Sequence, residues 1–268
     1  MSSHRLSPEE ARSLARDGYL VRERVIAGGD LERLQKSCEA LVARLVARPL
    51  ATPRVPAGSY VFQVDPELAT VLKWEPEHPD VVMGIEPFAH FDAELRAWGE
   101  DARFADPIRD LLGFDEVELF TEKLNVKRAR VGGPIVLHQD YPYWVANSEN
   151  AAEIATAVVF LDDAHGGNGG LEVLPGSHAA GPREGGAKAG FGKFEMKPDA
   201  IDARELVTLE VPAGSVVWFG SLLVHRSQPN RSGADRRTLL YSYQPAGRAP
   251  SVDSLIELLA RPRAGRDA

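Results

Sequence analysis

The chain has 268 residues, of which 44% are hydrophobic, and this is enough to bury one large core. We therefore expect a single domain over residues 1–268. A formal net charge of −8 argues against a nucleic-acid-binding surface, which needs a concentrated basic stripe. The single cysteine excludes an intrachain disulfide framework, and no stretch reaches the ~20 apolar residues of a membrane span or forms an N-terminal signal core. We expect a cytoplasmic protein without membrane contact.

Two helices and a strand are predicted near the N-terminus. Ser7 is placed to cap a helix, Glu10 can complete a capping box, and Gly18 is expected to end that helix. Residues 19–26 are predicted as a short strand. A second helix is predicted to open at Asp30, because apolar residues recur along it at three- and four-residue intervals: Leu31, Leu34, Cys38, Leu41 and Leu45.

Residues 57–118 are predicted as irregular strands followed by helices. Phe91, Leu95 and Trp98 fall on one helical face, which indicates core packing. The expected order is an N-terminal part with helices at about 7–118, a β-rich core at about 119–247, and a C-terminal helix and tail at 248–268.

From residue 121 onward the pattern changes to the period of two that is typical of a strand. Polar and apolar side chains alternate, with Lys123, Asn125 and Lys127 on one face and Leu124 and Val126 on the other. Polar residues on an inward barrel face are costly unless a polar group occupies the interior, so Lys123 and Asn125 are candidates to contact a cosubstrate. The alternative is an amphipathic strand whose polar face lies in water.

The motif that points to chemistry is His138-Gln139-Asp140, followed much later by His225 and, eleven positions on, by Arg236. Two histidines and one carboxylate can occupy one face of Fe(II) and leave three positions open for a bidentate cosubstrate and O₂. On an extended strand alternate residues point the same way, so His138 and Asp140 are expected to bind one metal from a strand. An isolated His-x-Asp is weak evidence, since it also occurs as a solvated pair or as a hydrogen-bonded, satisfied histidine.

Glycine is dense between residues 164 and 193, and such a segment does not hold one rigid shape cheaply. It is either a lid that orders over bound substrate or an ordinary long surface loop. Beyond it, residues 206–211 and 215–219 are predicted as strands on either side of a Pro-Ala-Gly turn, and the second of them leads towards His225. Four of the remaining histidines are expected to be structural or solvent-facing: His4, His78, His90 and His178. His165 lies in the glycine-rich segment and lacks ligand spacing.

Several segments, in this order, resemble the phytanoyl-CoA dioxygenase family. They are Leu137-His138-Gln139-Asp140-Tyr141, residues 157–163 (AVVFLDD), residues 168–178 (NGGLEVLPGSH) and residues 225–232 (HRSQPNRS), closed by Arg236-Arg237. The matching blocks run from about residue 120 to 245. The family usually has Lys-x-Pro or Lys-Pro-Pro where this chain has Lys127-Arg128-Ala129-Arg130, so the role of Lys127 stays open.

The resemblance implies a mainly β fold with flanking α-helices around a double-stranded β-helix, the jelly-roll core also found in cupins. It further implies an enzyme that binds Fe(II) and 2-oxoglutarate, uses O₂ and hydroxylates a small molecule. His138, Asp140 and His225 match the metal ligands, Arg236 the residue that pairs with the distal carboxylate of 2-oxoglutarate, and Ser227 its hydroxyl partner. A guanidinium can hold a carboxylate through two parallel hydrogen bonds. Arg237 is the competitor, and the two neighbours face opposite ways on a strand.

Because Asp140 is a carboxylate, the coordination position that a halide would take is filled, and hydroxylation is favoured over halogenation. Tyr141, Tyr143 and Trp144 follow the metal motif and either line the substrate pocket or pack at the barrel mouth. Two other functions are weighed: a cupin-like Zn²⁺-dependent hydrolase or isomerase, which would not need Arg236, and a sensor that binds a 2-oxo acid without turnover. No residue names the substrate or the oligomeric state.

Overall fold

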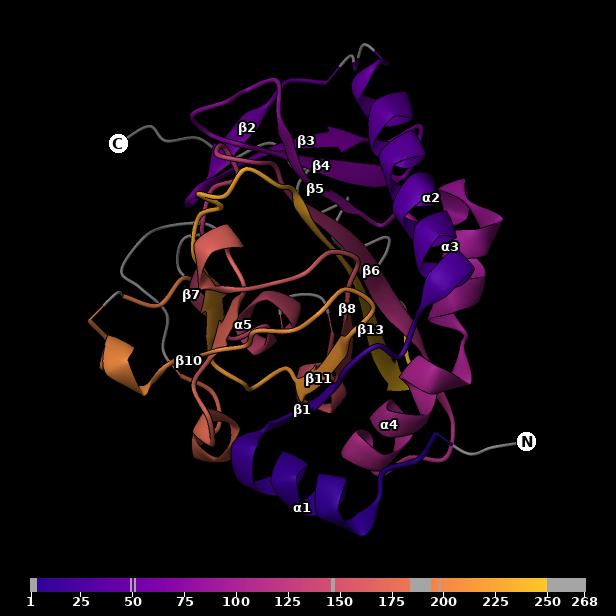
Figure 1. Cartoon of the computed structure of the whole chain (residues 1–268), viewed down its shortest axis with the longest axis vertical. Coiled ribbons are helices and arrows are strands. Elements are labelled where there is room, and N and C mark those ends of the chain that lie inside the picture. The colour runs from indigo at the N-terminus through magenta and orange to yellow at the C-terminus, as the bar shows by residue number, and fades with distance from the viewer. Residues whose placement is uncertain are drawn as a thin grey trace.

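Two antiparallel sheets form the centre of the computed structural model, which describes residues 4–48, 50, 52–145, 148–183, 194–197 and 199–249 (Figure 1). The larger sheet has the strand order β1 (Tyr19–Arg22), β11 (Val216–Gly220), β8 (Ala155–Phe160), β13 (Arg236–Pro245), β6 (Val117–Lys127), β5 (Val82–Glu86), β4 (Thr70–Trp74), β3 (Tyr60–Asp65) and β2 (Val55–Ala57). The smaller sheet has the order β10 (Val207–Thr208), β9 (Leu171–Val173), β12 (His225–Ser227) and β7 (Ile135–His138).

The double-stranded β-helix is formed by β11, β8, β13 and β6 of the larger sheet together with the smaller sheet. This confirms the predicted fold class. The two strands expected at 206–211 and 215–219 belong to opposite sheets, because β10 pairs with β9 whereas β11 pairs with β8 and β1. The Pro-Ala-Gly turn therefore carries the chain from one sheet to the other.

Helices cover the outer face of the larger sheet. They are α1 (Pro8–Asp17), α2 (Gly28–Val46), α3 (Ala93–Gly99) and α4 (Ala102–Leu112), and a short helix, α5 (Tyr141–Trp144), follows β7. In Figure 1 α2, α3 and α4 lie on the right-hand side while α1 lies at the bottom. The short 3-10 turns are Ala89–Phe91, Ala151–Glu153, Gly166–Asn168, Ser177–Ala180 and Ala203–Glu205. The apolar face predicted for α2 is buried against this sheet, with Cys38 and its helical neighbours in one cluster with Trp218 and Tyr241.

Polar ends of the buried aromatic residues are paired across this interface. Trp218 donates its indole N–H to the carbonyl of Phe104 at 3.1 Å, and the Tyr241 hydroxyl donates to the carbonyl of Leu95 at 2.8 Å. Because the rings supply apolar area while the N–H and O–H stay satisfied, α3 and α4 are held in fixed positions against the sheet.

The N-terminal predictions are confirmed in part. The capping box between Ser7 and Glu10 is present, and Gly18 ends α1 at φ 83°. The strand expected at 19–26 ends at Arg22, because the chain turns at Arg24 (φ 52°). α2 begins two residues before Asp30.

Strands of the N-terminal part extend the larger sheet of the core. β5 pairs with β6 through Gly84↔Asn125 and Ile85↔Leu124, and β4, β3 and β2 follow outward. The stretch expected as irregular strands is therefore a regular continuation of the core sheet, which places its inward side chains on the wall of the interior.

The expectation of a segment without rigid shape is wrong for residues 164–183. This stretch contains β9, which pairs with both β10 and β12. Gly169 has φ +78°, and a Cβ there would lie 2.4 Å from the carbonyl oxygen of Gln228. Glycine here permits a close backbone approach and does not confer freedom. The rest of the proposed lid, residues 184–193, lies outside the described residues.

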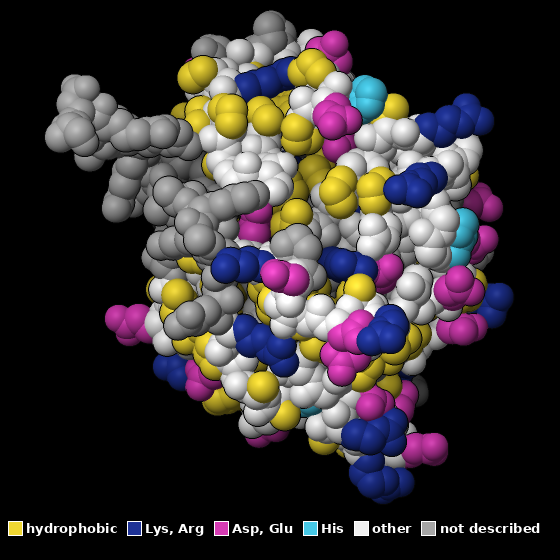
Figure 2. All heavy atoms as spheres, turned by 90° about the vertical axis from the view of Figure 1, so that its left-hand side faces the viewer, with side chains coloured by type: hydrophobic (Ala, Val, Ile, Leu, Met, Phe, Trp, Pro, Cys, Tyr) yellow, Lys and Arg dark blue, Asp and Glu magenta, His cyan; other side chains and the backbone are white. Residues whose placement is uncertain are grey.

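The predicted C-terminal helix and tail lie outside the described residues from residue 250 onward. Within the part of the chain that the structure describes, no helix combines the length and apolar character required to cross a membrane. Figure 2 shows the face that lies on the left in Figure 1, where hydrophobic side chains gather in the upper part and basic and acidic side chains mix below them.

Candidate metal and cosubstrate site

The structure brings His138, Asp140 and His225 together. β7 and β12 are paired with His138 opposite His225, and the two imidazole ring centroids lie 4.2 Å apart. One ligand atom from each of the three residues lies within 4.8 Å of the others. They form the group of His, Cys, Asp or Glu side chains that meets the spacing of a metal site among the described residues.

The backbone at Asp140 differs from the prediction. β7 ends at His138, and Asp140 has the helical angles φ −71° and ψ −31° as the residue before α5. Its carboxylate reaches the centre because the chain turns there, and Oδ1 of Asp140 lies 3.4 Å from Nε2 of His138. The expectation that both residues extend from one strand is wrong, although the convergence that it predicted is present.

Backbone carbonyls orient both histidine rings. Nδ1 of His138 lies 2.8 Å from the carbonyl oxygen of Val136, and Nδ1 of His225 lies 3.0 Å from that of Leu223. Since a carbonyl oxygen only accepts hydrogen bonds, each Nδ1 carries the proton and each Nε2 directs its lone pair towards the centre.

The charges of the site suit a divalent metal. Burial, together with the neighbouring His138, lowers the pKa of His225 to about 4. Burial raises the pKa of Asp140, but the close approach of His138 and His225 outweighs it and brings this pKa down to about 2. At neutral pH the site offers a neutral His225 imidazole and a charged Asp140 carboxylate, which are the forms that bind metal ions. The residues present therefore fit Fe(II).

Arg236 and Ser227 also line this cavity, and each keeps a polar atom unpaired. Arg236 is 4% exposed, and its guanidinium donates to the carbonyl of Gly169 at 2.7 Å and to the Thr238 hydroxyl at 3.2 Å. Its Nε and the Ser227 Oγ are buried without a hydrogen-bond partner among the described residues. Buried donors are rarely left unsatisfied, so these two atoms fit a carboxylate ligand such as that of 2-oxoglutarate.

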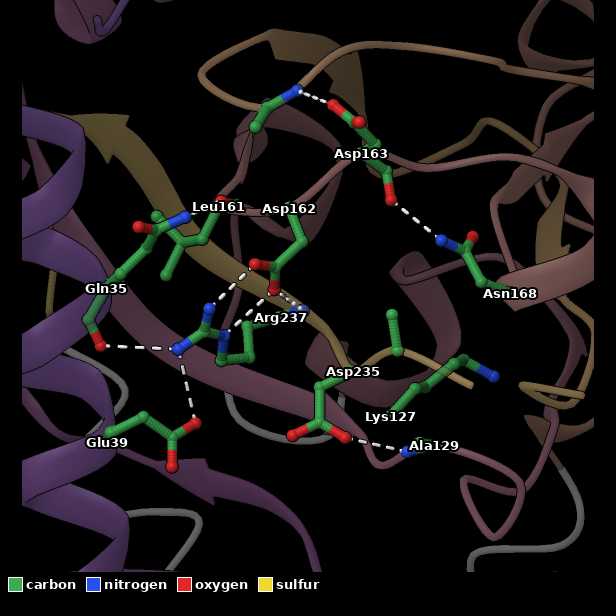
Figure 3. Close-up of polar contacts among 12 residues, drawn as sticks. Gln35, Glu39, Lys127, Ala129, Leu161, Asp162, Asp163, Asn168, Asp235 and Arg237 are labelled. Carbon is green, nitrogen blue, oxygen red and sulfur yellow. Dashed lines mark hydrogen bonds and ion pairs between the residues drawn. The ribbon is translucent and has the colours of Figure 1, made fainter. Parts of the chain in front are cut away.

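Arg237 lies on the other face of β13, as the period of the strand requires. Its Nε and Nη2 donate to the carboxylate of Asp162 at 2.8 and 2.7 Å, and Nη1 lies 3.3 Å from Glu39 on α2 (Figure 3). Arg237 thus ties the sheet to a helix and does not enter the cavity.

The polar face predicted for β6 points inward. Lys123 and Asn125 line the cavity, and Lys123 forms an ion pair with Glu86 at 3.0 Å. Lys127 is buried on the same face but donates to the carbonyls of Gly133 and Gln228 at 2.6 and 2.7 Å. Burial and the nearby Arg236 lower the pKa of Lys127 to about 6. The alternative of a solvated polar face is wrong.

The three aromatic residues after the metal motif take different positions. Tyr143 and Trp144 line the cavity, and the Tyr143 ring stands edge-on to His138 with centroids 5.6 Å apart. Trp144 also packs against Phe120, with ring centroids 5.7 Å apart. Tyr141 is not among the cavity-lining residues and packs against the cluster of Phe120 and Trp144.

The cavity has a volume of about 140 Å³, room for roughly ten water molecules. Lining residues that the sequence analysis did not identify include Tyr60, Lys73, Glu86 and Thr238. Thr238 had a usable signal, because it lies two residues after Arg236 on the same strand face. The others come from β3, β4 and β5, whose pairing with the core is not local in sequence.

Comparison with known proteins agrees with this architecture. The family model of phytanoyl-CoA dioxygenase (PhyH) matches residues 14–238. The chain belongs to the phytanoyl-CoA dioxygenase family. The matched residues include the metal motif, His225 and Arg236.

Two curated relatives of this family member act on small molecules. L-proline trans-4-hydroxylase of Streptomyces griseoviridis is 33% identical over 153 residues, which are 50% of this chain and 57% of that protein. Ectoine dioxygenase of Sphingopyxis alaskensis is 29% identical over 174 residues, which are 65% of this chain and 50% of that protein. The matches thus span about half the length of these relatives.

Solved structures of low sequence identity share the fold of this phytanoyl-CoA dioxygenase family member. EctD from S. alaskensis with 2-oxoglutarate and 5-hydroxyectoine superposes with a TM-score of 0.70 at 23% identity, covering 91% of this chain and 77% of that one. The epimerase SnoN in complex with Fe³⁺, alpha-ketoglutarate and nogalamycin RO has a TM-score of 0.68 at 20% identity, covering 97% and 91%.

Proposed function

We propose that this chain is an Fe(II)- and 2-oxoglutarate-dependent dioxygenase that hydroxylates an unactivated C–H bond of a small molecule. One observation carries the proposal: a single cavity has His138, Asp140 and His225 at one place and the unpaired Arg236 Nε and Ser227 Oγ at another. The relatives named above support it, since they include hydroxylases and dioxygenases of small molecules. We also propose that the whole chain functions as one domain.

When bound, iron and 2-oxoglutarate would supply the chemistry of O₂ activation. Oxidative decarboxylation of 2-oxoglutarate to succinate and CO₂ would be coupled to hydroxylation of a nearby C–H bond, with one atom of O₂ entering succinate and the other the hydroxyl group. His138, Asp140 and His225 would hold the metal by one face and leave its other positions open. The Asp140 carboxylate would fill the coordination position that a halide ligand would otherwise take. Hydroxylation is accordingly the outcome that we propose.

Arg236 would bind and orient the distal carboxylate of 2-oxoglutarate. Burial lowers the pKa of Arg236 to about 10, so its guanidinium stays charged at neutral pH. A carboxylate would satisfy the unpaired Nε and the Ser227 hydroxyl together, and the planar guanidinium would fix the direction of the acid. The apolar lining from Val158, Phe160 and Phe219 would limit access of water to the reacting atoms.

The test is anaerobic addition of 2-oxoglutarate to the Fe(II)-loaded protein, followed by oxygenation with a library of small metabolites. We expect a visible charge-transfer band on addition of 2-oxoglutarate and succinate release that at least one metabolite stimulates. Activity with Zn²⁺ and without O₂ would indicate a hydrolase or isomerase. A band without O₂ uptake under any condition would indicate a 2-oxo-acid sensor.

A further inference from the structure

Six charged side chains line the cavity, and three of them belong to ion pairs within the protein. They are Lys73, Glu86, Lys123, Asp140, Arg226 and Arg236. Lys123 is neutralised by Glu86 at 3.0 Å. Arg226 is neutralised by Glu172 of the neighbouring strand β9 at 2.5 Å. Both ion pairs are internal to the protein and leave no net charge for a ligand.

The remaining three charged groups are not equivalent. In the proposed function Asp140 binds the metal, and Arg236 binds the distal carboxylate of 2-oxoglutarate. Lys73 is then a cation on the cavity wall with neither a carboxylate nor a hydrogen-bond acceptor in contact with it among the described residues. The cavity therefore carries one positive charge that neither the protein nor the proposed cosubstrate neutralises.

The surroundings of Lys73 are aromatic. Its Nζ lies 4.2 Å from the centroid of the Tyr60 ring and 5.4 Å from that of Phe62, both on the adjacent strand β3. Burial, together with the like charge of Lys123, lowers the pKa of Lys73 to about 7. The rings attract the ammonium through their faces but do not neutralise it. A bound anion would favour the charged form of the amine, because its attraction would offset the cost of burying that charge.

The position of Lys73 separates it from the 2-oxoglutarate anchor. Cross-strand partners run in one row from Thr238 on β13 through Asn125 and Gly84 to Lys73 on β4. The backbones of Thr238 and Lys73 are therefore three strand spacings apart, about 14 Å along the sheet. Lys73 thus belongs to the wall added by the N-terminal strands, whereas Arg236 belongs to the β-helix core.

We propose that Lys73 binds a carboxylate of the primary substrate, and that Tyr60 and Phe62 pack against the adjoining carbon skeleton. This assignment rests on the proposed function, because it takes Arg236 and the metal as the sites of 2-oxoglutarate. One unneutralised positive charge matches a monoanion such as a carboxylate, whereas a phosphate ester would bring an additional negative charge. The cavity of about 140 Å³ would also hold 2-oxoglutarate, so the space beside Lys73 suits a small acid.

The experiment compares carboxylic acids with their uncharged primary amides as probes. L-proline, L-pipecolate and cyclohexanecarboxylate are each tested beside their amide on the protein loaded with Fe(II) and 2-oxoglutarate, by succinate release and by anaerobic thermal shift. We expect at least one acid to act at a concentration about 10- to 100-fold lower than its amide, the ratio of one charge-assisted hydrogen bond. Lys73→Met should abolish this ratio, and Lys73→Arg should retain part of it.

The matched control is Lys36→Met, which removes an exposed lysine on α2 and should preserve the ratio. The affinity for 2-oxoglutarate, read from the charge-transfer band, should stay unchanged in Lys73→Met. The proposal is wrong if no acid in the set exceeds its amide while the band forms, or if Lys73→Met weakens 2-oxoglutarate binding as strongly as loss of Arg236 does. Absence of the band in the unmodified protein would instead refute the proposed function, and the substrate assignment with it.

Discussion

The neighbouring arginines of β13 allow a double test, because Arg236 and Arg237 face opposite sides of one strand. Replacing Arg236 with Met should remove two charge-assisted hydrogen bonds to 2-oxoglutarate, worth about 3 kcal/mol, and raise its dissociation constant roughly 100-fold. The free energy of unfolding should change by less than about 1 kcal/mol, because two effects oppose each other. The substitution removes the hydrogen bonds to Gly169 and Thr238, which destabilises the fold, but it also removes the cost of burying a cation.

Arg237→Met should have the opposite profile. The Arg237 and Asp162 side chains are only 14% and 18% exposed, and the change would leave the Asp162 carboxylate without its bidentate partner. We expect a loss of about 3 kcal/mol of stability, or roughly 5–10 °C in Tm. The affinity for 2-oxoglutarate should be preserved, because this guanidinium lies on the helix-facing side of the sheet.

The assay is anaerobic titration of 2-oxoglutarate into each Fe(II)-loaded variant, with thermal unfolding followed by circular dichroism in parallel. The reasoning fails if Arg237→Met weakens 2-oxoglutarate binding as much as Arg236→Met does. It also fails if Arg236→Met is the more destabilising of the two changes.

Three further changes test the metal set and the fold. His225→Ala should abolish stoichiometric iron binding, measured by metal analysis after desalting, and full iron content would remove His225 from the ligand set. Gly214→Ala should destabilise the fold by at least about 2 kcal/mol in denaturant unfolding. Gly214 has φ +83°, and the new Cβ would lie 1.9 Å from the Ile26 carbonyl oxygen. An unchanged unfolding midpoint would contradict this steric argument. The hydrogen bonds from Arg22 are the main cause that lowers the pKa of Glu10 from 4.5 to about 2, so this pair should stabilise the fold above pH 4.5 and lose its contribution as the pH falls towards 2. Glu10→Gln should reduce the pH dependence of the unfolding free energy in that range by about 1 kcal/mol after solvent screening. An identical acid unfolding curve would mean that the pair contributes no stability.

The order of the ligands was predictable, because a histidine, a carboxylate two residues on and a distant histidine followed by arginine form a pattern with a chemical reason. The backbone at Asp140 was misjudged. Pro142, in the first turn of α5, was an available sign that a helix begins directly after the motif. The dense glycines were interpreted as a sign of conformational freedom. Glycine is required at position 169 because the Gln228 backbone approaches closely, and that contact is distant in sequence.

The wall that carries Lys73 could not be predicted for a related reason. Its position depends on the pairing of β5 with β6 through Gly84↔Asn125 and Ile85↔Leu124, and no local pattern specifies which distant strand a short strand will join. Irregular strands were expected in this part of the chain, but the strands beside β4 determine that Lys73 reaches the cavity.

The nine-stranded sheet divides the interior between two stretches of chain. Residues 60–86 supply one wall, whereas the side chains proposed for iron and the 2-oxo acid come from residues 138–140 and 225–236. Substitutions in the first stretch can therefore change substrate specificity without changing the residues proposed to bind iron and 2-oxoglutarate. A library confined to positions 60, 62, 71 and 73 would sample new specificities on an unaltered catalytic scaffold, which makes this edge of the sheet the natural starting point for redesign.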